Sequence, residues 1–195
     1  MLKTTLMLED ELSSYGNPRN KIGRMVAVGE LTPVRRGLYE TSRTTPGQCL
    51  AQCVYGPSYL SFEYALAFHG LIPEQVRAYT SATCGKNRAK RFQSAFGLFV
   101  YRDVPVAVFS RSVLLRFEEG RPFWIASPEK ALCDELYKLP PATSRDRLEA
   151  LLFDDLRVGF DGLAALDATI VRSLSERYRS RSVLQLASYL EGMPS

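Results

Sequence analysis

Few side chains in this sequence have the type and spacing that acid–base or metal chemistry requires. The chain of 195 residues contains one histidine, His69, so a histidine-assisted nucleophile would have to use that residue. Asp103, Glu118 and Glu119 lie beside predicted strands, and with a lysine they could hold Mg²⁺ for nucleic-acid hydrolysis. Their spacing does not specify such a site, and exposed turn residues explain these acids more simply. His69 precedes a glycine, so we expect it to form a hydrogen bond at a helix end.

The four cysteines are expected to be reduced thiols in or near the core: Cys49, Cys53, Cys84 and Cys133. In a sequence without an export signal, thiols are more common than disulfides. Cys49 and Cys53 could share one helical face, but a zinc site needs further ligands. The sequence contains no glycine-rich phosphate loop and no nucleophile elbow. We therefore predict no catalytic residue, no metal and no cofactor.

Basic side chains are clustered, and the chemistry that clustered cations favour is phosphate binding. The formal net charge of the chain is +4, and a short segment near the N-terminus accounts for it, with one acid (Glu30) and five cations: Arg19, Lys21, Arg24, Arg35 and Arg36. A second group lies where the sequence has no acid: Lys86, Arg88, Lys90 and Arg91. This second group is either a solvated loop tip or a patch for nucleic acid or an acidic partner.

The first group of cations lies on elements that resemble a DNA-reading module. Residues 2–14 are predicted to form an amphipathic helix, and Asn17-Pro18 is a typical start for a second helix that Gly29 ends. Residues 30–40 are predicted to form a β-hairpin that turns at 35–37. Two helices and a hairpin with arginines at its tip are typical of a winged helix-turn-helix, whose second helix enters the major groove. The alternative is a helix and hairpin whose arginines are only solvated.

The rest of the chain is predicted to be a core built around residues 57–83. A helix that is apolar on almost every side, and therefore buried, is expected to end at Gly70 and to be followed by a strand over 78–83. Short strands that form a small, mainly antiparallel sheet are predicted over 92–102, 106–109, 113–117 and 122–126. Ser127-Pro128 is expected to start a helix on that sheet, and further helices are predicted over 144–154, 162–179 and 182–190.

Several stretches resemble the antitoxin component (AbiEi family) of type IV bacterial toxin–antitoxin systems. The resemblance begins in residues 57–83 and continues through Phe96-Gly97-Leu98-Phe99-Val100-Tyr101 and Ser127-Pro128-Glu129-Lys130-Ala131-Leu132-Cys133-Asp134. The winged helix of that family ends in a pattern matched here by Gly29-Glu30-Leu31 and Arg35-Arg36-Gly37-Leu38-Tyr39. The resemblance implies a transcriptional regulator that represses its own operon and counteracts a nucleotidyltransferase-type toxin. A usual winged helix has one more helix in front, so we expect a short module.

We therefore predict an α+β fold with three parts: a winged helix-turn-helix module over 1–46, an α/β core over 47–140 and a helical C-terminal part over 141–195. The expected function is that of a non-enzymatic, DNA-binding regulator in the cytoplasm, with operator DNA and a toxin as partners and no membrane. Two alternatives stay open. One is a metal-dependent nucleic-acid-processing enzyme, and the other is a protein-interaction module with a degenerate winged helix.

Overall fold

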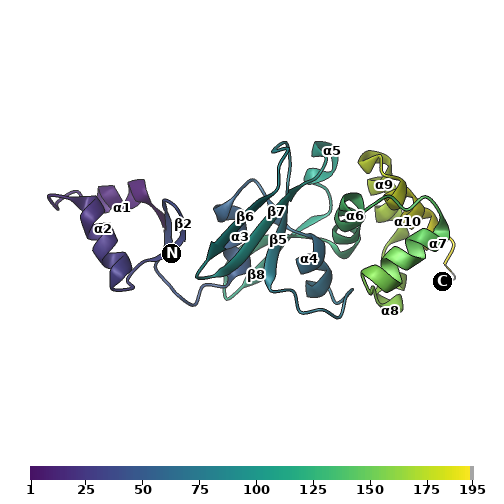
Figure 1. The fold of residues 1–195 in the computed structure, drawn as a ribbon, viewed down its shortest axis with the longest axis horizontal. Coiled ribbons are helices and arrows are strands. Elements are labelled where there is room, and N and C mark those ends of the chain that lie inside the picture. Colours follow the sequence, from purple (N-terminus) through teal and green to yellow (C-terminus); the bar gives the residue numbers. More distant parts are fainter. Residues whose placement is uncertain (194–195) are drawn as a thin grey trace.

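Two sheets of different size organise the computed structural model, which describes residues 1–193 and is elongated (Figure 1). In chain order the strands are β1 (Leu2–Thr4), β2 (Thr32–Arg35), β3 (Leu38–Glu40), β4 (Tyr59–Leu60), β5 (Ala78–Thr83), β6 (Lys90–Ser94), β7 (Gly97–Asp103), β8 (Val113–Glu118) and β9 (Arg121–Ala126). The helices are α1 (Thr5–Glu11), α2 (Pro18–Ala27), α3 (Gly47–Val54), α4 (Phe62–Phe68), α5 (Val106–Phe109), α6 (Pro128–Lys138), α7 (Arg145–Glu149), the π-helical η1 (Ala150–Asp155), α8 (Phe160–Ala164), α9 (Ala168–Tyr178) and α10 (Arg181–Glu191). The α+β prediction is confirmed.

The N-terminal part is a three-stranded antiparallel sheet, in the order β1-β3-β2, with α1 and α2 on one face. Leu8, Ile22 and Leu31 form its small core. Two helices followed by a β-hairpin is the order of elements that the sequence predicted for this part. The predicted helix over 2–14 is wrong at its start, because Leu2–Thr4 pairs with β3 and the helix begins only after Thr4, whose hydroxyl accepts the Met7 amide hydrogen. That pairing joins segments far apart in the sequence, so local periodicity could not reveal it.

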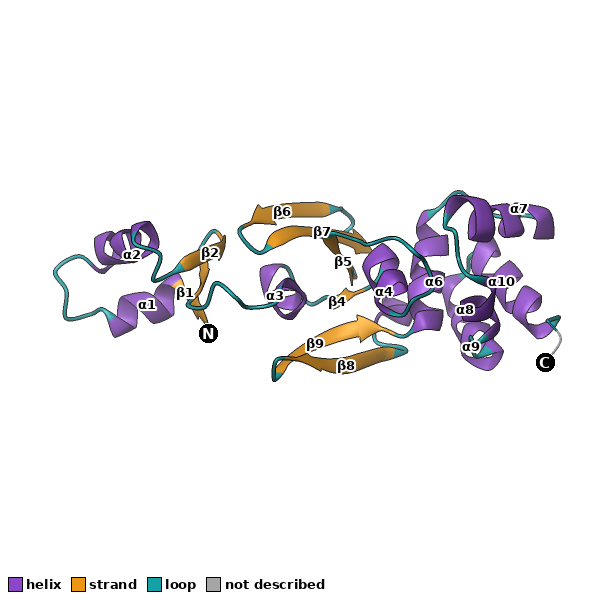
Figure 2. Ribbon diagram, turned by 90° about the horizontal axis from the view of Figure 1, so that it is seen from below, coloured by secondary structure: helices purple, strands orange, loops and turns teal. Residues whose placement is uncertain are grey.

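The central part is a six-stranded sheet in the order β6-β7-β5-β4-β9-β8. Three of its pairings are antiparallel, and two, β4 with β9 and β5 with β7, are parallel. The sheet is strongly curved, so that the β6–β7 and β8–β9 hairpins lie on either side of α3 (Figure 2). The buried Tyr101 hydroxyl donates to the carbonyl oxygen of Ala51 in α3 at 2.6 Å, which ties β7 to that helix.

Two sequence predictions for the central part are wrong. Residues 106–109, predicted as a strand, form α5, because Pro105 precedes the turn and its carbonyl accepts the Val108 amide hydrogen at 3.1 Å. The central helix is also shorter than expected, because Tyr59–Leu60 belongs to β4 and α4 starts at Phe62. Its predicted end is confirmed, since Gly70 takes the left-handed conformation with φ of 72°.

The C-terminal part packs four helices and η1 against α6 (Figure 1). The predicted start of α6 is confirmed: the Ser127 hydroxyl accepts the Lys130 amide hydrogen at 3.3 Å, and Pro128 occupies the first helical position. The helix predicted over 162–179 is interrupted, because Asp167 caps a new helix by accepting from the Thr169 amide at 2.8 Å. Local polar residues, rather than the apolar period, set this break.

A buried polar cluster joins α6 to β4 and α9. Lys130 and Asp134 are both fully buried and form an ion pair at 2.7 Å. The second Asp134 oxygen accepts from the hydroxyls of Tyr59 at 3.0 Å and Ser61 at 2.6 Å, and the Tyr178 hydroxyl also contacts both members of the ion pair. Burial, followed by the Asp134 charge, raises the pKa values of both tyrosines well above their ordinary value. Lys130 and Asp134 belong to the Ser127–Asp134 stretch that carries the family resemblance. In the folded chain their side chains are therefore used for packing.

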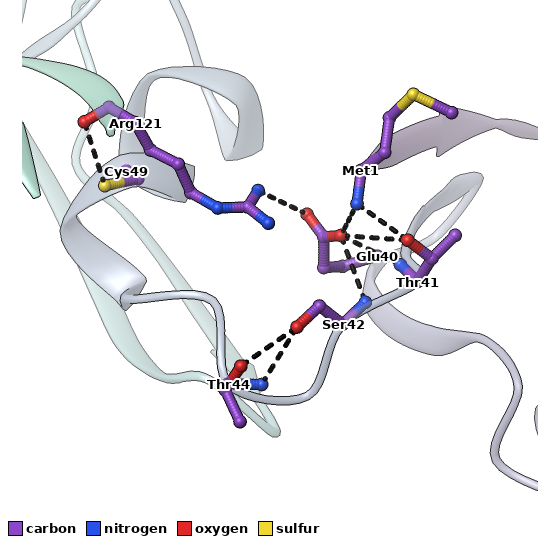
Figure 3. Close-up of polar contacts among 7 residues, drawn as sticks. All are labelled: Met1, Glu40, Thr41, Ser42, Thr44, Cys49 and Arg121. Atoms are coloured by element: carbon purple, nitrogen blue, oxygen red, sulfur yellow. Dashed lines mark hydrogen bonds and ion pairs between the residues drawn. The ribbon is translucent and has the colours of Figure 1, made fainter. Parts of the chain in front are cut away.

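The N-terminal sheet packs on the central part through the face opposite α1 and α2. Val34 and Leu38 belong to the main core, and both are at least nine-tenths buried. Between the two parts lies the fully buried Glu40, whose carboxylate accepts from the amides of Thr41 at 2.9 Å and Ser42 at 3.2 Å (Figure 3). The same carboxylate also contacts the Met1 amine, and it lies 3.6 Å from the Arg121 guanidinium at the start of β9. The connection over 41–46 is therefore held in place.

Candidate nucleic-acid interface

Helix α2 presents a cationic surface because its apolar side is used by the small core. Ile22 is buried against Leu8 and Leu31, with Met25 and Val26 beside them. Asn17 fixes the start of the helix by accepting the Asn20 amide hydrogen at 3.1 Å. The residues left on the outside are Arg19, Asn20, Gly23, Arg24 and Ala27, all exposed. Helix α2 lies at the end of the molecule remote from the C-terminal helices (Figure 1).

The three predicted cations of α2 differ in their surroundings. Arg24 is exposed and has no ion pair within residues 1–193. Arg19 is 81% exposed and donates from Nε to Glu9 of α1 at 2.6 Å. Lys21 is half-buried, and its ammonium lies 5.4 Å from the centre of the Tyr15 ring. Arg24 is thus the cation most available to a phosphate.

Asn20 is a further candidate contact residue on α2 that charge alone does not reveal. Its amide side chain lies on the exposed side of α2, one turn before Arg24. Asparagine can donate and accept at a base edge in the major groove, which is the contact that carries sequence discrimination. Spacing from the Asn17 cap was the signal that could have identified it.

The two wing arginines lie where the hairpin turns. Arg35 ends β2 and Arg36 begins the turn, both exposed, and Gly37 takes a φ of 78°. The Gly37 carbonyl accepts the Thr5 amide hydrogen at 3.1 Å, which places the tip beside the start of α1. The five predicted cations thus occupy two separate elements of one module, α2 and the hairpin.

The second cationic group is shaped by Asp103 at the end of β7. One carboxylate oxygen of Asp103 accepts from the amides of Lys86 and Asn87, both at 2.6 Å, and the other accepts from the Thr83 hydroxyl at 2.6 Å. Asn87 consequently adopts a positive φ of 54°, and the chain turns before β6 begins at Lys90. Arg88 and Lys90 therefore do not lie on one continuous strand, because the segment before Lys90 is a turn.

Two adjacent hollows lie beside this loop, with volumes of about 710 and 690 Å³. Arg88 lines the first and Arg91 the second, while Arg102 lines both. The Arg102 guanidinium contacts Glu63 and lies 3.3 Å from the carboxylate of Glu135. One guanidinium, which lines both hollows, is therefore already paired with two carboxylates.

Glu135 should give the protein an unusual dependence of stability on pH. Burial, and next the Glu63 charge, raise the pKa of Glu135 to about 7 from 4.5, with Arg102 opposing. Between these values the folded state holds a proton that the unfolded chain has lost, so the free energy of unfolding falls as pH rises through that window. Glu135→Gln should flatten this dependence and stabilise the protein above pH 7 by about 1–3 kcal/mol.

Urea denaturation of parent and variant across pH 4–8 provides the measurement. Glu149→Gln is the matched control, because Glu149 forms an exposed ion pair with Arg145 and its replacement should leave the pH profile unchanged. A Glu135→Gln profile parallel to that of the parent would contradict the assignment.

The carboxylates that an enzyme would need do not come together. Asp103 ends β7, whereas Glu118 and Glu119 lie at the β8–β9 turn, and β5, β4 and β9 separate the two places in the sheet. Within residues 1–193 no group of three or more His, Cys, Asp or Glu side chains is arranged to hold a metal ion. As expected for a helix end, a ring nitrogen of His69 lies 2.8 Å from the Ala126 carbonyl oxygen. Burial lowers the pKa of this imidazole below its ordinary value, with the Ala126 hydrogen bond opposing.

The four thiols are free, and two of them, Cys49 and Cys133, are buried. Burial raises the pKa of both, so neither is an activated nucleophile. Among residues 1–193, every helix is too short or too polar to cross a bilayer.

Comparison with known proteins gives a similarity in fold. No protein-family model matches the chain, and no curated protein matches it. Among solved structures, the chain is similar to the RV2827C protein from Mycobacterium tuberculosis, with a TM-score of 0.59 and 18% identity over 97% of this chain and 71% of that one. At this level of identity the similarity supports the fold alone.

Proposed function

We propose that this chain is a DNA-binding transcriptional regulator of the type IV antitoxin kind that its sequence resembles. In this proposal it binds operator DNA of its own operon in the cytoplasm and counteracts a nucleotidyltransferase-type toxin. It acts without a catalytic site, a metal or a cofactor. The toxin and the autorepression come from the sequence resemblance, and the DNA-binding part has support from the shape of the N-terminal module.

The exposed cationic side of α2 is the observation that carries DNA binding. A helix of this length fits the major groove, and arginines on its outer side can reach the phosphates that border the groove. The wing tip, with Arg35 and Arg36, lies on the same module and can add backbone contacts. The central part covers the other face of the small sheet, through Val34 and Leu38, and leaves the outer side of α2 uncovered. A covered α2 would have favoured the interaction-module alternative.

Loss of cations from the module should weaken DNA binding at every sequence. Arg19→Ala/Arg24→Ala and Arg35→Ala/Arg36→Ala should each reduce the slope of log affinity against log salt by up to about 1.8, because each phosphate contact contributes about 0.9. Gel-shift titration of promoter DNA from the operon, at several salt concentrations, measures this slope. Arg177→Ala, an exposed arginine of α9, is the control and should behave like the parent.

Asn20→Ala tests whether Asn20 contacts a base, which gives sequence specificity, in contrast to the phosphate contacts of the arginines. It should lower affinity for operator DNA by about 1–3 kcal/mol while leaving binding to unrelated DNA unchanged. If both double-arginine variants bind with the salt slope of the parent, the module does not bind DNA in the proposed way.

A further inference from the structure

Strand β8 is an open edge of the central sheet. Among residues 1–193 it pairs with β9 alone, and it lies at the outer margin of the molecule (Figure 2). Along one face its side chains are apolar and exposed: Leu115 is 40% exposed and Phe117 63%, with Trp124 of β9, opposite Leu115, 43% exposed. Natural proteins usually protect such an edge, because its unpaired backbone groups can bind another strand.

The register of β8 with β9 shows which backbone groups point outward. Ser112 accepts from the Ser127 amide at 2.8 Å, directly opposite it in the register. Because hydrogen-bonded and non-hydrogen-bonded pairs alternate in an antiparallel ladder, the amides and carbonyls of Val113, Leu115 and Phe117 face away from β9. An added antiparallel strand must therefore place its own outward-facing residues opposite these three.

The charged residues of β8 lie on the other face of the strand. Arg116 and Glu118 are exposed, and neither has an ion pair within residues 1–193. In an antiparallel pair of β8 strands centred on Phe117, Arg116 of each copy lies opposite Glu118 of the other, as a non-hydrogen-bonded pair. Side chains are closest in such pairs, so two opposite-charge contacts form at once.

We propose that β8 pairs with β8 of a second copy of this chain, antiparallel and centred on Phe117. The two-fold axis passes through the Phe117 pair, whose backbone groups exchange hydrogen bonds, and the two Arg116–Glu118 contacts flank it. The two central sheets become one continuous sheet. This pairing does not depend on DNA binding, but it would carry two copies of α2, as symmetric operators require.

The charges favour this register over the longer pairing that is centred on Leu115. Pairing centred on Leu115 also satisfies the outward-facing backbone groups, but it places Arg116 opposite Leu114 and Glu118 opposite Ser112 of the second copy. No charge is then compensated. Only the register centred on Phe117 pairs every charged side chain of the strand with its opposite.

Charge reversal tests both the surface and the register. Sedimentation equilibrium of the full chain should show a dimer, and Arg116→Glu or Glu118→Arg should each raise its Kd about tenfold or more, because like charges then face each other twice. An equimolar mixture of these two variants should dimerise again, since each Glu of one variant meets an Arg of the other. Thermal melts confirm that each variant is folded.

The mixture is the decisive sample, because two variants that had merely lost structure would not restore each other. Phe117→Lys provides the second test, since a lysine on the edge should abolish the dimer while leaving the fold intact. A parent that stays monomeric leaves the edge to a strand of another protein and overturns the proposal. A mixture that stays monomeric while the parent dimerises also overturns it, because the register is then different.

Discussion

Replacement of Asp134 or Lys130 by alanine is expected to destabilise the protein by about 3–5 kcal/mol, because either change leaves the other charge buried without its partner. Both residues are fully buried, so water cannot compensate the remaining charge. Asp134→Ala also leaves the hydroxyls of Tyr59, Ser61 and Tyr178 without their acceptor. Urea denaturation followed by circular dichroism measures the loss, which is a large part of the stability of a typical domain.

A second ion pair in the same chain provides a control of equal spacing. Arg145 and Glu149 are also four residues apart on a helix and 2.9 Å apart, but their side chains are 69% and 38% exposed. Glu149→Ala should cost no more than about 0.5 kcal/mol, as exposed pairs of this spacing usually do. If Asp134→Ala and Glu149→Ala had equal effects, burial would not control the strength of these pairs.

Leu66→Ala is expected to cost about 2–5 kcal/mol, because it opens a cavity between α4 and the sheet. The Leu66 side chain is fully buried in the main core. Phe68 is only two residues away, and the sequence predicted it to be equally buried, but it is 45% exposed and makes an edge-on contact with Phe123 at 6.0 Å. Phe68→Ala should therefore cost about 1 kcal/mol.

Thermal melts of the two variants, measured side by side, test the position of α4. The smaller side chain should give the larger loss of stability, which is the reverse of what side-chain size alone predicts. Equal losses would mean that α4 is buried on both sides, as the sequence pattern suggested.

Features of the fold that depend on neighbouring residues were predictable from the sequence. Asn17-Pro18 and Ser127-Pro128 start helices because a cap and a fixed φ act within one turn. Gly37 and Gly70 mark turns because they accept a positive φ. The hairpin over 32–40 follows from the same local chemistry.

Features that depend on distant partners were not predictable in this way. Leu2–Thr4 and Tyr59–Leu60 are strands because of pairing partners elsewhere in the chain, and nothing in their own period shows it. The burial of the charged residues of α6 also depends on distant parts of the chain. The spacing of Lys130 and Asp134 in the sequence does not reveal that Tyr59 and Tyr178 enclose them in the folded protein.

For the candidate site, the cations of α2 and the wing tip could be named from composition, whereas their individual environments could not. Within residues 1–193, Arg19 contacts Glu9 whereas Arg24 has no ion pair, and this difference depends on how α1 and α2 pack. Likewise, the turn at Lys86 and Asn87 forms around Asp103, which comes many residues later.

The packing of the small sheet on the central part can also be considered as a binding equilibrium within one molecule. The short connection over 41–46 keeps the faces that contain Val34 and Leu38 near their site at an effective concentration on the order of millimolar. An interface whose separated halves bound with a Kd of about 10 µM would then be closed about 99% of the time. Cutting the chain after residue 46 removes this advantage, so the two fragments should separate on dilution even though no contact between them has changed.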